Sequence, residues 1–381
     1  MIPYFKEFQY LQKNPLASFT EIASALGITD KTAKAHYNIL VSEGYIGKKV
    51  GNRVGLESVQ ARICVDSIGL KTYSIFVESN KLSNIEFLEK LADFHNFTSY
   101  RNRVIGSRQG LFLQFNIPQS AYRYLEDLLT ELNNLNIIDN FVILPSLDYH
   151  HSNFPDFTFY DNNKGEWVWQ IENGQINLGS WFKHFLTMSF ENNYNPHKCK
   201  NVMDKLTEID LQLLRQLTKD AREFSKIELA KKYSVSPATI TRRMKFLNDN
   251  VIKEYRLGYR RSKVQFVDLI MFRAYCSEEV KFKLYKLLRD SPVPFDSGFV
   301  LLGDGFLWRL NLPPVYTSAF SNLLWGVCDK LEYYHLDHIH SMLYWFYHKN
   351  FDIDTKSWKA GKEEVFDLPI EWIEKNITQI L

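Results

Sequence analysis

The side chains most suited to recognising another molecule lie in segment 236–247, SPATITRRMKFL. Arg242 carries a planar guanidinium whose parallel N–H groups match O6 and N7 of guanine in the major groove of DNA. Ile240, Met244 and Leu247 recur at i, i+4 and i+7, so a helix here would bury them and expose the other face. We therefore predict a base-reading helix. The residues predicted to contact DNA from it are Ser236, Ala238, Thr239, Thr241, Arg242, Arg243 and Lys245.

A second segment, 18–40, aligns without a gap to 225–247 at a constant offset of 207. The matching face of its last helix carries lysines and no arginine. Because lysine favours phosphate contact over bidentate base readout, we expect the second copy to discriminate DNA sequence more strongly. The residues predicted to contact DNA from the first copy are Lys31, Thr32, Lys34 and Asn38.

Basic residues also follow each of these helices. The β-prone stretches there predict a small hairpin, or wing, whose cations contact phosphates. A plain solvated surface position is the alternative for each of them, and Arg243 would bond either a phosphate or its own domain. The predicted wing contacts are Lys48, Lys49 and Arg53 in the first copy and Arg256, Arg260 and Arg261 in the second.

Helix-start signals define the elements that must position these side chains. Each copy opens with Ser-x-x-Glu, at Ser18 and at Ser225, a capping box in which serine and glutamate satisfy each other's backbone N–H. Thr207 and Asp210 form a third box before an amphipathic helix. The chain is therefore predicted to contain a winged helix-turn-helix twice.

The regions after the two copies share a second pattern, strand-helix-strand-strand-helix-strand. The stretches GLFLQFNIP, 110–118, and GFLWRLNLP, 305–313, mark the same third strand in each. The order βαββαβ is that of a ferredoxin-like sandwich, so the predicted fold class is α+β with two domains of each kind. Aromatic-rich extensions follow both and are expected to pack the halves together. The predicted boundaries are 1–57, 58–148, 149–202, 203–263, 264–342 and 343–381.

Composition limits the class of protein. The net charge of the 381 residues is only +2, but residues 203–263 hold 15 Lys and Arg against 8 Asp and Glu, a balance of 15 − 8 = +7. Such a concentration of positive charge suits a phosphate-backbone partner. No long apolar run predicts a membrane segment. The four cysteines are far apart, which predicts no disulfide and a cytoplasmic protein.

Residues 206–255 closely resemble the DNA-binding domain of the Lrp/AsnC (feast/famine) regulators of prokaryotes. The similarity rests on the Asp-x-x-Leu-Leu first helix, ELAKKYSVS and RRMKFL followed by VIKEY. It implies a transcriptional regulator of double-stranded DNA whose βαββαβ domains dimerise by their sheets and bind amino-acid effectors. The two domains here would pair within one chain as a pseudo-dimer, with further dimers or larger assemblies also compatible. Of the acidic residues that accompany the family's glycine turn, this chain offers Asp304.

Two alternatives remain open. Siroheme decarboxylases resemble the same two-domain unit, and His335, His338 and His340 could serve tetrapyrrole or metal chemistry, since His338 and His340 would share a strand face. The other alternative is an architectural protein that binds DNA without sequence choice. No P-loop, His-Glu-x-x-His or paired-carboxylate motif occurs. We predict no enzyme activity, no cofactor and no bound metal.

Overall fold

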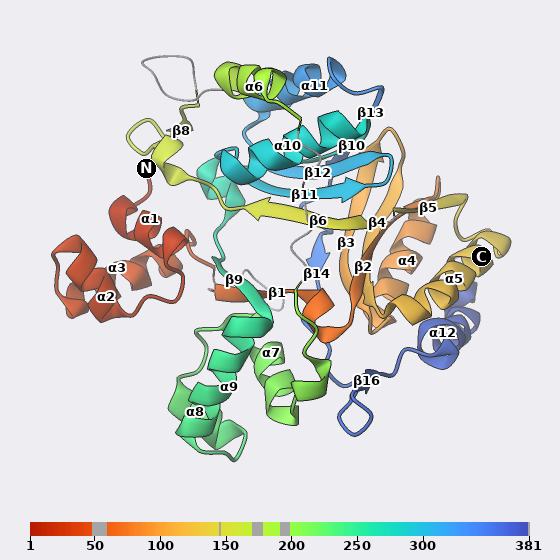
Figure 1. The fold of residues 1–381 in the computed structure, drawn as a ribbon, viewed down its shortest axis with the longest axis horizontal. Helices are drawn as coiled ribbons and strands as arrows, with labels where there is room; N and C mark the ends of the chain where they lie inside the picture. The colour runs from red at the N-terminus through yellow and green to blue at the C-terminus, as the bar shows by residue number, and fades with distance from the viewer. Residues whose placement is uncertain (48–58, 145, 170–177, 191–198, 380–381) are drawn as a thin grey trace.

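The computed structural model describes residues 1–47, 59–144, 146–169, 178–190 and 199–379. Two small helical domains lie to one side of a larger body made of sheets and covering helices (Figure 1). The predicted α+β class is confirmed.

Each helical domain contains three helices in helix-turn-helix order. Its capping boxes form as predicted: the backbone N–H groups of Ser18 and Ser225 each donate to the carboxylate three residues on, at 2.7 Å in both copies. The turns that join the helices are thereby set by local sequence. The helices are α1 (Phe5–Lys13), α2 (Phe19–Leu26) and α3 (Asp30–Ser42) in the first domain, and α7 (Glu208–Asp220), α8 (Lys226–Lys232) and α9 (Pro237–Asn250) in the second.

A two-stranded ribbon connects the helical domains to the larger body. It consists of β1 (Val59–Ile63) paired antiparallel with β9 (Ile252–Leu257), one strand from each half of the chain. The hairpin predicted within the second copy is therefore wrong, because β9 hydrogen-bonds to β1 of the other half. Most of the predicted first wing, 48–58, lies outside the described residues. The ribbon has one apolar face toward the helical domains and one polar face, with Arg62 and Glu254 as Cα partners.

The larger body contains two ferredoxin-like domains. In each, the four strands run in spatial order 4-1-3-2, as β5-β2-β4-β3 and β13-β10-β12-β11. Strand β3 of one pairs with β13 of the other, so the domains share one continuous sheet. The first comprises β2 (Lys71–Glu78), α4 (Leu82–Phe94), β3 (Thr98–Gly106), β4 (Gly110–Ile117), α5 (Tyr122–Asn134) and β5 (Asn140–Leu144). The second comprises β10 (Asp268–Tyr275), α10 (Glu278–Asp290), β11 (Asp296–Leu302), β12 (Gly305–Leu312), α11 (Thr317–Trp325) and β13 (Lys330–Leu336).

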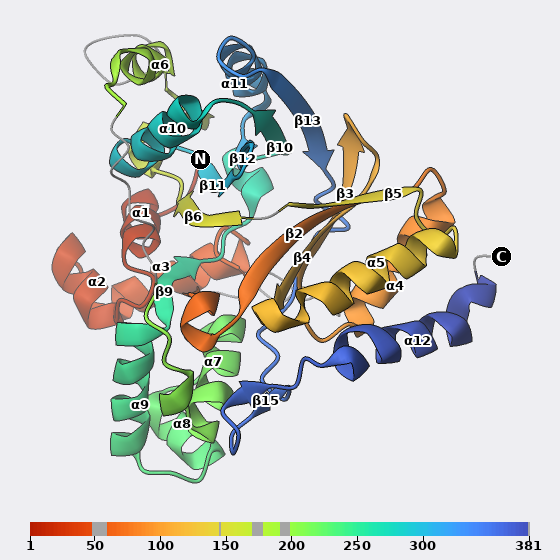
Figure 2. The same cartoon turned by 45° about the vertical axis from the view of Figure 1, so that its right-hand side comes forward.

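Besides this edge-to-edge pairing of β3 with β13, the sheets of the two domains also face each other. Helices α4 and α5 cover one face of the first sheet, and α10 and α11 cover one face of the second (Figures 1 and 2). The opposite faces meet in a separate apolar core, in which the Phe76 and Tyr334 rings stack 4.7 Å apart. The third strands of the two domains, β4 and β12, start in the same way. Gly110 has φ 153° and Gly305 has φ 155°, and a Cβ at either position would lie about 2 Å from a carbonyl oxygen, so both positions require glycine.

The aromatic-rich extensions cross between the halves. The indole N–H of Trp167 donates to the carbonyl oxygen of Val264 in the second half, and that of Trp358 donates to Ile68 in the first, both at 2.7 Å. Strand β6 also pairs with β11, and β14 with β3. Each extension therefore covers the other half. Their elements are β6 (Ser146–Asn153), β7 (Tyr160–Asp161), β8 (Glu166–Trp167), α6 (Leu178–Thr187), β14 (Met342–Leu343), β15 (Phe351–Asp352), β16 (Ser357–Trp358), the π-helix η7 (Glu363–Asp367) and α12 (Leu368–Asn376).

Short 3-10 helices complete the chain. The first of them, η1 (Val65–Ile68), follows β1 and accepts the indole hydrogen bond of Trp358. The others are η2 (Gln119–Ala121), η3 (Phe157–Phe159), η4 (Met203–Lys205), η5 (Arg261–Val264), η6 (Pro314–Tyr316) and η8 (Ile377–Gln379).

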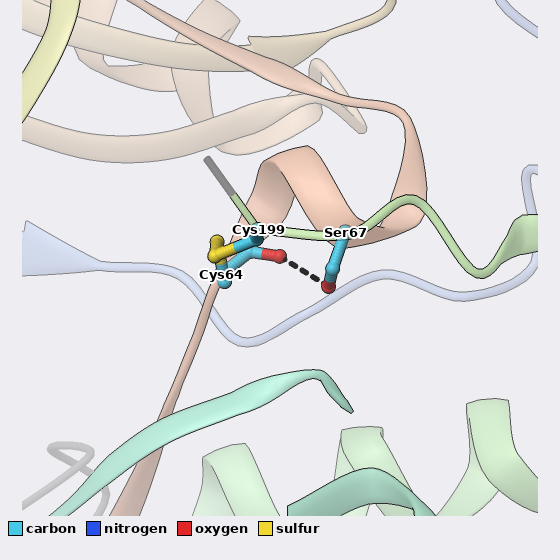
Figure 3. The surroundings of a disulfide bond; sticks show 3 residues. All are labelled: Cys64, Ser67 and Cys199. Carbon is cyan, nitrogen blue, oxygen red and sulfur yellow. Dashed lines mark hydrogen bonds between the residues drawn. A yellow bond between two sulfur atoms is a disulfide. The ribbon is translucent and has the colours of Figure 1, made fainter. Parts of the chain in front are cut away.

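Cys64 and Cys199 form a disulfide, so the prediction of no disulfide is wrong (Figure 3). Their separation of 135 residues hid the contact, because the fold returns the chain at Cys199 to the end of β1. Ser67 Oγ donates to the Cys64 carbonyl oxygen at 2.7 Å, and Val202 N donates to the Ser67 carbonyl oxygen at 2.8 Å. Within the described ranges, no helix is both long and apolar enough to cross a membrane.

Candidate nucleic-acid interface and central cavity

The predicted base-reading helix is α9. Ser236 caps it, since its Oγ accepts from Thr239 N at 3.1 Å, and Pro237 occupies its first turn. Ile240 and Leu247 are fully buried. Thr241 turns its hydroxyl back to the Pro237 carbonyl oxygen at 3.0 Å. The helix therefore presents an exposed face to solvent. The predicted contacts exposed on it are Ser236, Ala238, Thr241, Arg242 and Lys245, with Thr239 partly buried.

Arg242 and Arg243 have different environments. The Arg243 guanidinium donates to both carboxylate oxygens of Asp210, to Oδ1 at 2.7 Å, and Asp210 is fully buried at the start of α7. Arg243 also donates to the Lys205 carbonyl oxygen at 3.1 Å. Of its two predicted roles, the structure shows the bond to its own domain. Arg242, by contrast, makes no hydrogen bond or ion pair with any described residue.

The first copy presents a smaller set of cations. Lys31, Lys34 and Asn38 are exposed on α3, whereas Thr32 is partly buried and its hydroxyl lies 2.8 Å from Thr29 Oγ1. The described part of the chain thus leaves both lysines of this face open to solvent.

The two helix-turn-helix domains contact each other. Arg222, in the turn after α7, donates from Nε to the Pro15 carbonyl oxygen at 2.8 Å and also bonds the Ala17 carbonyl oxygen. Its guanidinium lies 5.4 Å from the ring of Tyr37 on α3. The separation of α3 and α9 is therefore constrained by a direct domain contact rather than by a linker alone.

Two of the predicted wing residues point inward, so their assignment as phosphate contacts is corrected. Arg256 lies 2.8 Å from Glu254 and 3.8 Å from Asp296, and Arg261 lies 3.7 Å from Asp296. For Arg256 the reason is the ribbon, which turns the polar side of β9 toward the sheet of the second domain. Arg261 lies beyond the ribbon, in η5, and reaches the same carboxylate. Arg260 is exposed, as predicted for a surface residue. Lys48, Lys49 and Arg53 lie outside the described residues.

The three histidines of segment 335–340 do not form a common site. His335 Nε2 lies 2.8 Å from Tyr333 Oη, His338 Nε2 lies 3.0 Å from the Val267 carbonyl oxygen, and His340 Nδ1 lies 2.6 Å from Asp337. Strand β13 ends at Leu336, so His338 and His340 do not share a strand face as expected. No group of three metal-ligating side chains occurs in the ranges that the structure describes.

Asp304, the acidic residue of the glycine turn, is held by Arg273. The distance between Asp304 Oδ1 and Arg273 Nη2 is 2.5 Å. Arg273 is buried and donates from Nη1 to the Ala274 carbonyl oxygen at 2.7 Å, so the pair closes the turn between β11 and β12.

A cavity of about 640 Å³ lies where the ribbon, the first sheet and the second extension meet. Sequence patterns do not indicate it, because its walls come from segments far apart in the chain. Its cationic wall includes Arg62, Lys71 and Lys253, and Cys64 of the disulfide also lines it. The other walls are amide and aromatic side chains, including Gln114, Asn116, Tyr344, Trp345 and Phe346.

Comparison with known families identifies the helical domains. The model described as winged helix-turn-helix DNA-binding matches residues 8–46 and 206–250, the two segments that contain the helix-turn-helix units. A search of curated protein sequences finds no match.

Comparison with solved structures identifies the architecture of the whole chain. The crystal structure of the siroheme decarboxylase NirDL matches with a TM-score of 0.56 at 12% identity, over 98% of this chain and 99% of that one. Its complex with an iron-uroporphyrin III analogue matches with a TM-score of 0.55 at 12% identity, over 100% of both chains. LrpC of B. subtilis matches 35% of this chain and 95% of its own, at 21% identity and a TM-score of 0.30.

These similarities correct one prediction. The chain was expected not to be an enzyme, yet an enzyme has the same fold over its full length. That expectation is therefore not supported, because two domains of each kind in tandem occur in an enzyme as well. The chain contains two winged helix-turn-helix domains of the DNA-binding class, set in an architecture that siroheme decarboxylase NirDL also has.

Proposed function

We propose that this protein binds double-stranded DNA in a sequence-specific way, with α9 in a major groove. The observation that carries the proposal is Arg242, which is exposed and unpaired among the described residues on a helix whose opposite side is buried. A free guanidinium at that position can form the bidentate contact to guanine. The winged helix-turn-helix match over 206–250 supports the same partner.

The two copies are expected to contribute unequally. The α3 face offers Lys31 and Lys34, which as point charges suit phosphate oxygens rather than base edges. Because the two domains differ in sequence and contact each other through Arg222, a single chain should recognise an asymmetric site. Pairing of two chains would instead produce a site with two-fold symmetry.

Replacing Arg242 by alanine tests this proposal. A preferred duplex is first selected from a random pool with the intact chain, and affinities for it and for a random duplex are then measured at several salt concentrations. We expect Arg242→Ala to weaken the binding free energy for the selected duplex by about 1–3 kcal/mol. The preference for one base should also relax at a single position of the site. Lys245→Ala should weaken binding to both duplexes by the same factor. The slope of the logarithm of affinity against the logarithm of salt concentration should fall by about one.

The matched control is Arg123→Ala, an exposed arginine on α5, which should leave both affinities unchanged. Equal losses on selected and random duplexes with Arg242→Ala would assign Arg242 to a phosphate. An unchanged affinity would remove α9 as the recognition helix.

The second candidate function is binding and decarboxylation of an iron tetrapyrrole. It is favoured by the 640 Å³ cavity, whose cationic wall suits carboxylates and whose aromatic side suits a flat macrocycle. The full-length similarity to siroheme decarboxylase NirDL supports it. Decarboxylation would break the bond between a side-chain carbon and its carboxylate, release carbon dioxide and place a proton on that carbon.

Titration with iron-uroporphyrin III tests this candidate. Saturable binding should shift the Soret absorbance band, and Lys253→Gln should weaken binding, because Lys253 is an exposed cation on the cavity wall. Mass spectrometry of the tetrapyrrole after incubation would show loss of carbon dioxide from an enzyme. Binding with no mass change would leave the cavity as a ligand site, and no binding would exclude the candidate.

A further inference from the structure

A cluster of four arginines lies where the polar face of the ribbon meets the second sheet. Around the buried carboxylate of Asp296 lie Arg62 from β1, Arg256 from β9, Arg261 from η5 and Arg309 from β12. These residues come from three separate parts of the chain, and the ribbon brings them together. We call this group the central arginine cluster.

The carboxylates beside the central arginine cluster do not balance its charge. Arg62 has Arg256, Arg309, Asp296 and Glu254 as charged neighbours. Among the residues that the structure describes, four guanidinium groups against two carboxylates leave 4 − 2 = +2. Positive charge without a counter-charge is costly where it is enclosed, as at Arg62 Nε, so an anion in this position would lower the energy of the folded state.

The carboxylates are already engaged by part of the cluster. Glu254 lies 2.8 Å from Arg256, and Asp296 accepts a hydrogen bond of 2.8 Å from the Asn311 side chain. Arg256 and Arg261 approach Asp296 only to 3.8 and 3.7 Å. Arg62 and Arg309 therefore form no ion pair with a carboxylate of the described residues.

Three donors of this region have no acceptor among the described residues. Arg62 Nε and Tyr259 Oη are enclosed by protein and form no hydrogen bond. Arg309 forms no hydrogen bond or ion pair with the described residues, and its guanidinium lies 5.8 Å from the Tyr100 ring. An enclosed donor without an acceptor costs about 1–3 kcal/mol, and more when it is charged. Arg62 Nε and Tyr259 Oη are two such enclosed donors, and both have Arg309 as a charged neighbour. Together they point to an acceptor that the described residues do not supply.

We propose that Arg62, Arg309 and Tyr259 bind a small oxyanion, either a phosphate or a carboxylate. Arg62 also lines the 640 Å³ cavity, which provides a route for the anion from one side. Guanidinium groups pair with the oxygens of both anions in the same bidentate geometry.

The titration behaviour of the donors fits this role. Burial, followed by the charges of Arg256 and Arg309, lowers the pKa of Arg62 to about 9, so the group is still charged at neutral pH. Burial raises the pKa of Tyr259 well above its ordinary value, which keeps its hydroxyl protonated as a donor. Arg62 and Tyr259 are thus both donors at pH 7.

The first half has no such cluster on the corresponding strand. The glycine-started third strands align Arg309 of β12 with Gln114 of β4. Gln114 donates to Ser74 Oγ at 3.1 Å and is neutral. Because the fold accepts glutamine at the equivalent position, Arg309→Gln is a variant that should fold.

Anion-dependent thermal stability of the full chain tests the proposal. Inorganic phosphate and citrate are each titrated against chloride at constant ionic strength, and the midpoint of unfolding is followed by circular dichroism. We expect saturable stabilisation of the wild type by at least one of the two, as mass action requires for a ligand of the native state. Arg309→Gln should raise the apparent dissociation constant about tenfold or more, and Tyr259→Phe should raise it by less.

Arg123→Gln, at an exposed position of α5, is the matched control and should bind as the wild type does. Stabilisation by phosphate alone or citrate alone would identify the kind of anion. Absence of saturable stabilisation, or an equal response in Arg309→Gln, would overturn the proposal. The outcome is independent of DNA binding by α9. Although Arg62 is shared with the cavity wall, the tested residues Arg309 and Tyr259 are not part of that wall, so a failure here is distinguishable from a failure of tetrapyrrole binding.

Discussion

Reduction of the Cys64–Cys199 disulfide is expected to lower the free energy of unfolding by about 5 kcal/mol. The bond closes a loop between residues 135 positions apart, and in the chain-entropy model a loop of this length restricts the unfolded chain strongly. In the folded state it ties the end of β1 to the segment that leads into α7 (Figure 3). The hydrogen bond from Val202 N to the Ser67 carbonyl oxygen joins the same two segments. Hydrogen exchange of the amides of β1, η1 and α7 with and without dithiothreitol measures the difference.

The variant Cys64→Ser separates this effect from other consequences of the reductant. It should have the reduced protein's stability under both conditions, because it cannot form the bond. If dithiothreitol destabilised this variant as well, the effect would not come from Cys64–Cys199. Since Cys64 also lines the cavity, reduction should in addition loosen one cavity wall.

Replacing Asp210 by alanine is expected to destabilise the second helix-turn-helix domain by about 3–5 kcal/mol. Asp210 is fully buried and serves two partners: it completes the capping box at the start of α7 and pairs with Arg243 on α9. Its removal would leave the Arg243 guanidinium without a counter-charge in a half-buried position, and breaking one side of such a pair costs this much. Because a chain of several domains need not unfold in one step, hydrogen exchange of the α7 and α9 amides is the appropriate measurement.

Asp249→Ala is the control for this prediction. Asp249 is exposed near the end of α9, and its loss should change the exchange free energy by less than about 0.5 kcal/mol. Similar effects of the two variants would show that the pair of Asp210 and Arg243 is not what joins α7 to α9. The result also affects DNA measurements, because a loss of binding in an Arg243 variant would then reflect unfolding rather than a lost contact.

Local sequence determined the elements of this protein. Ser18 with Glu21 and Ser225 with Glu228 start equivalent helices, because a capping box needs only residues three positions apart. The burial of Ile240 and Leu247 follows from their spacing on one helix, and it decides that Arg242 is exposed. The βαββαβ order was likewise readable, since alternating strand and helix patterns and the two glycine turns are local features.

Tertiary structure alone decided how the halves use their polar residues. Arg256 carries the same charge as Arg242, but pairing of β9 with β1 turns it toward Asp296 instead of solvent. Arg261, in η5, also approaches Asp296. Contacts between residues more than 90 positions apart form the cavity and the Cys64–Cys199 bond. The same holds for the hydrogen bonds that Trp167 and Trp358 each donate to the other half, as from Trp167 to Val264. Such contacts leave no periodic trace in the sequence, because their partners are chosen by the packing of whole domains.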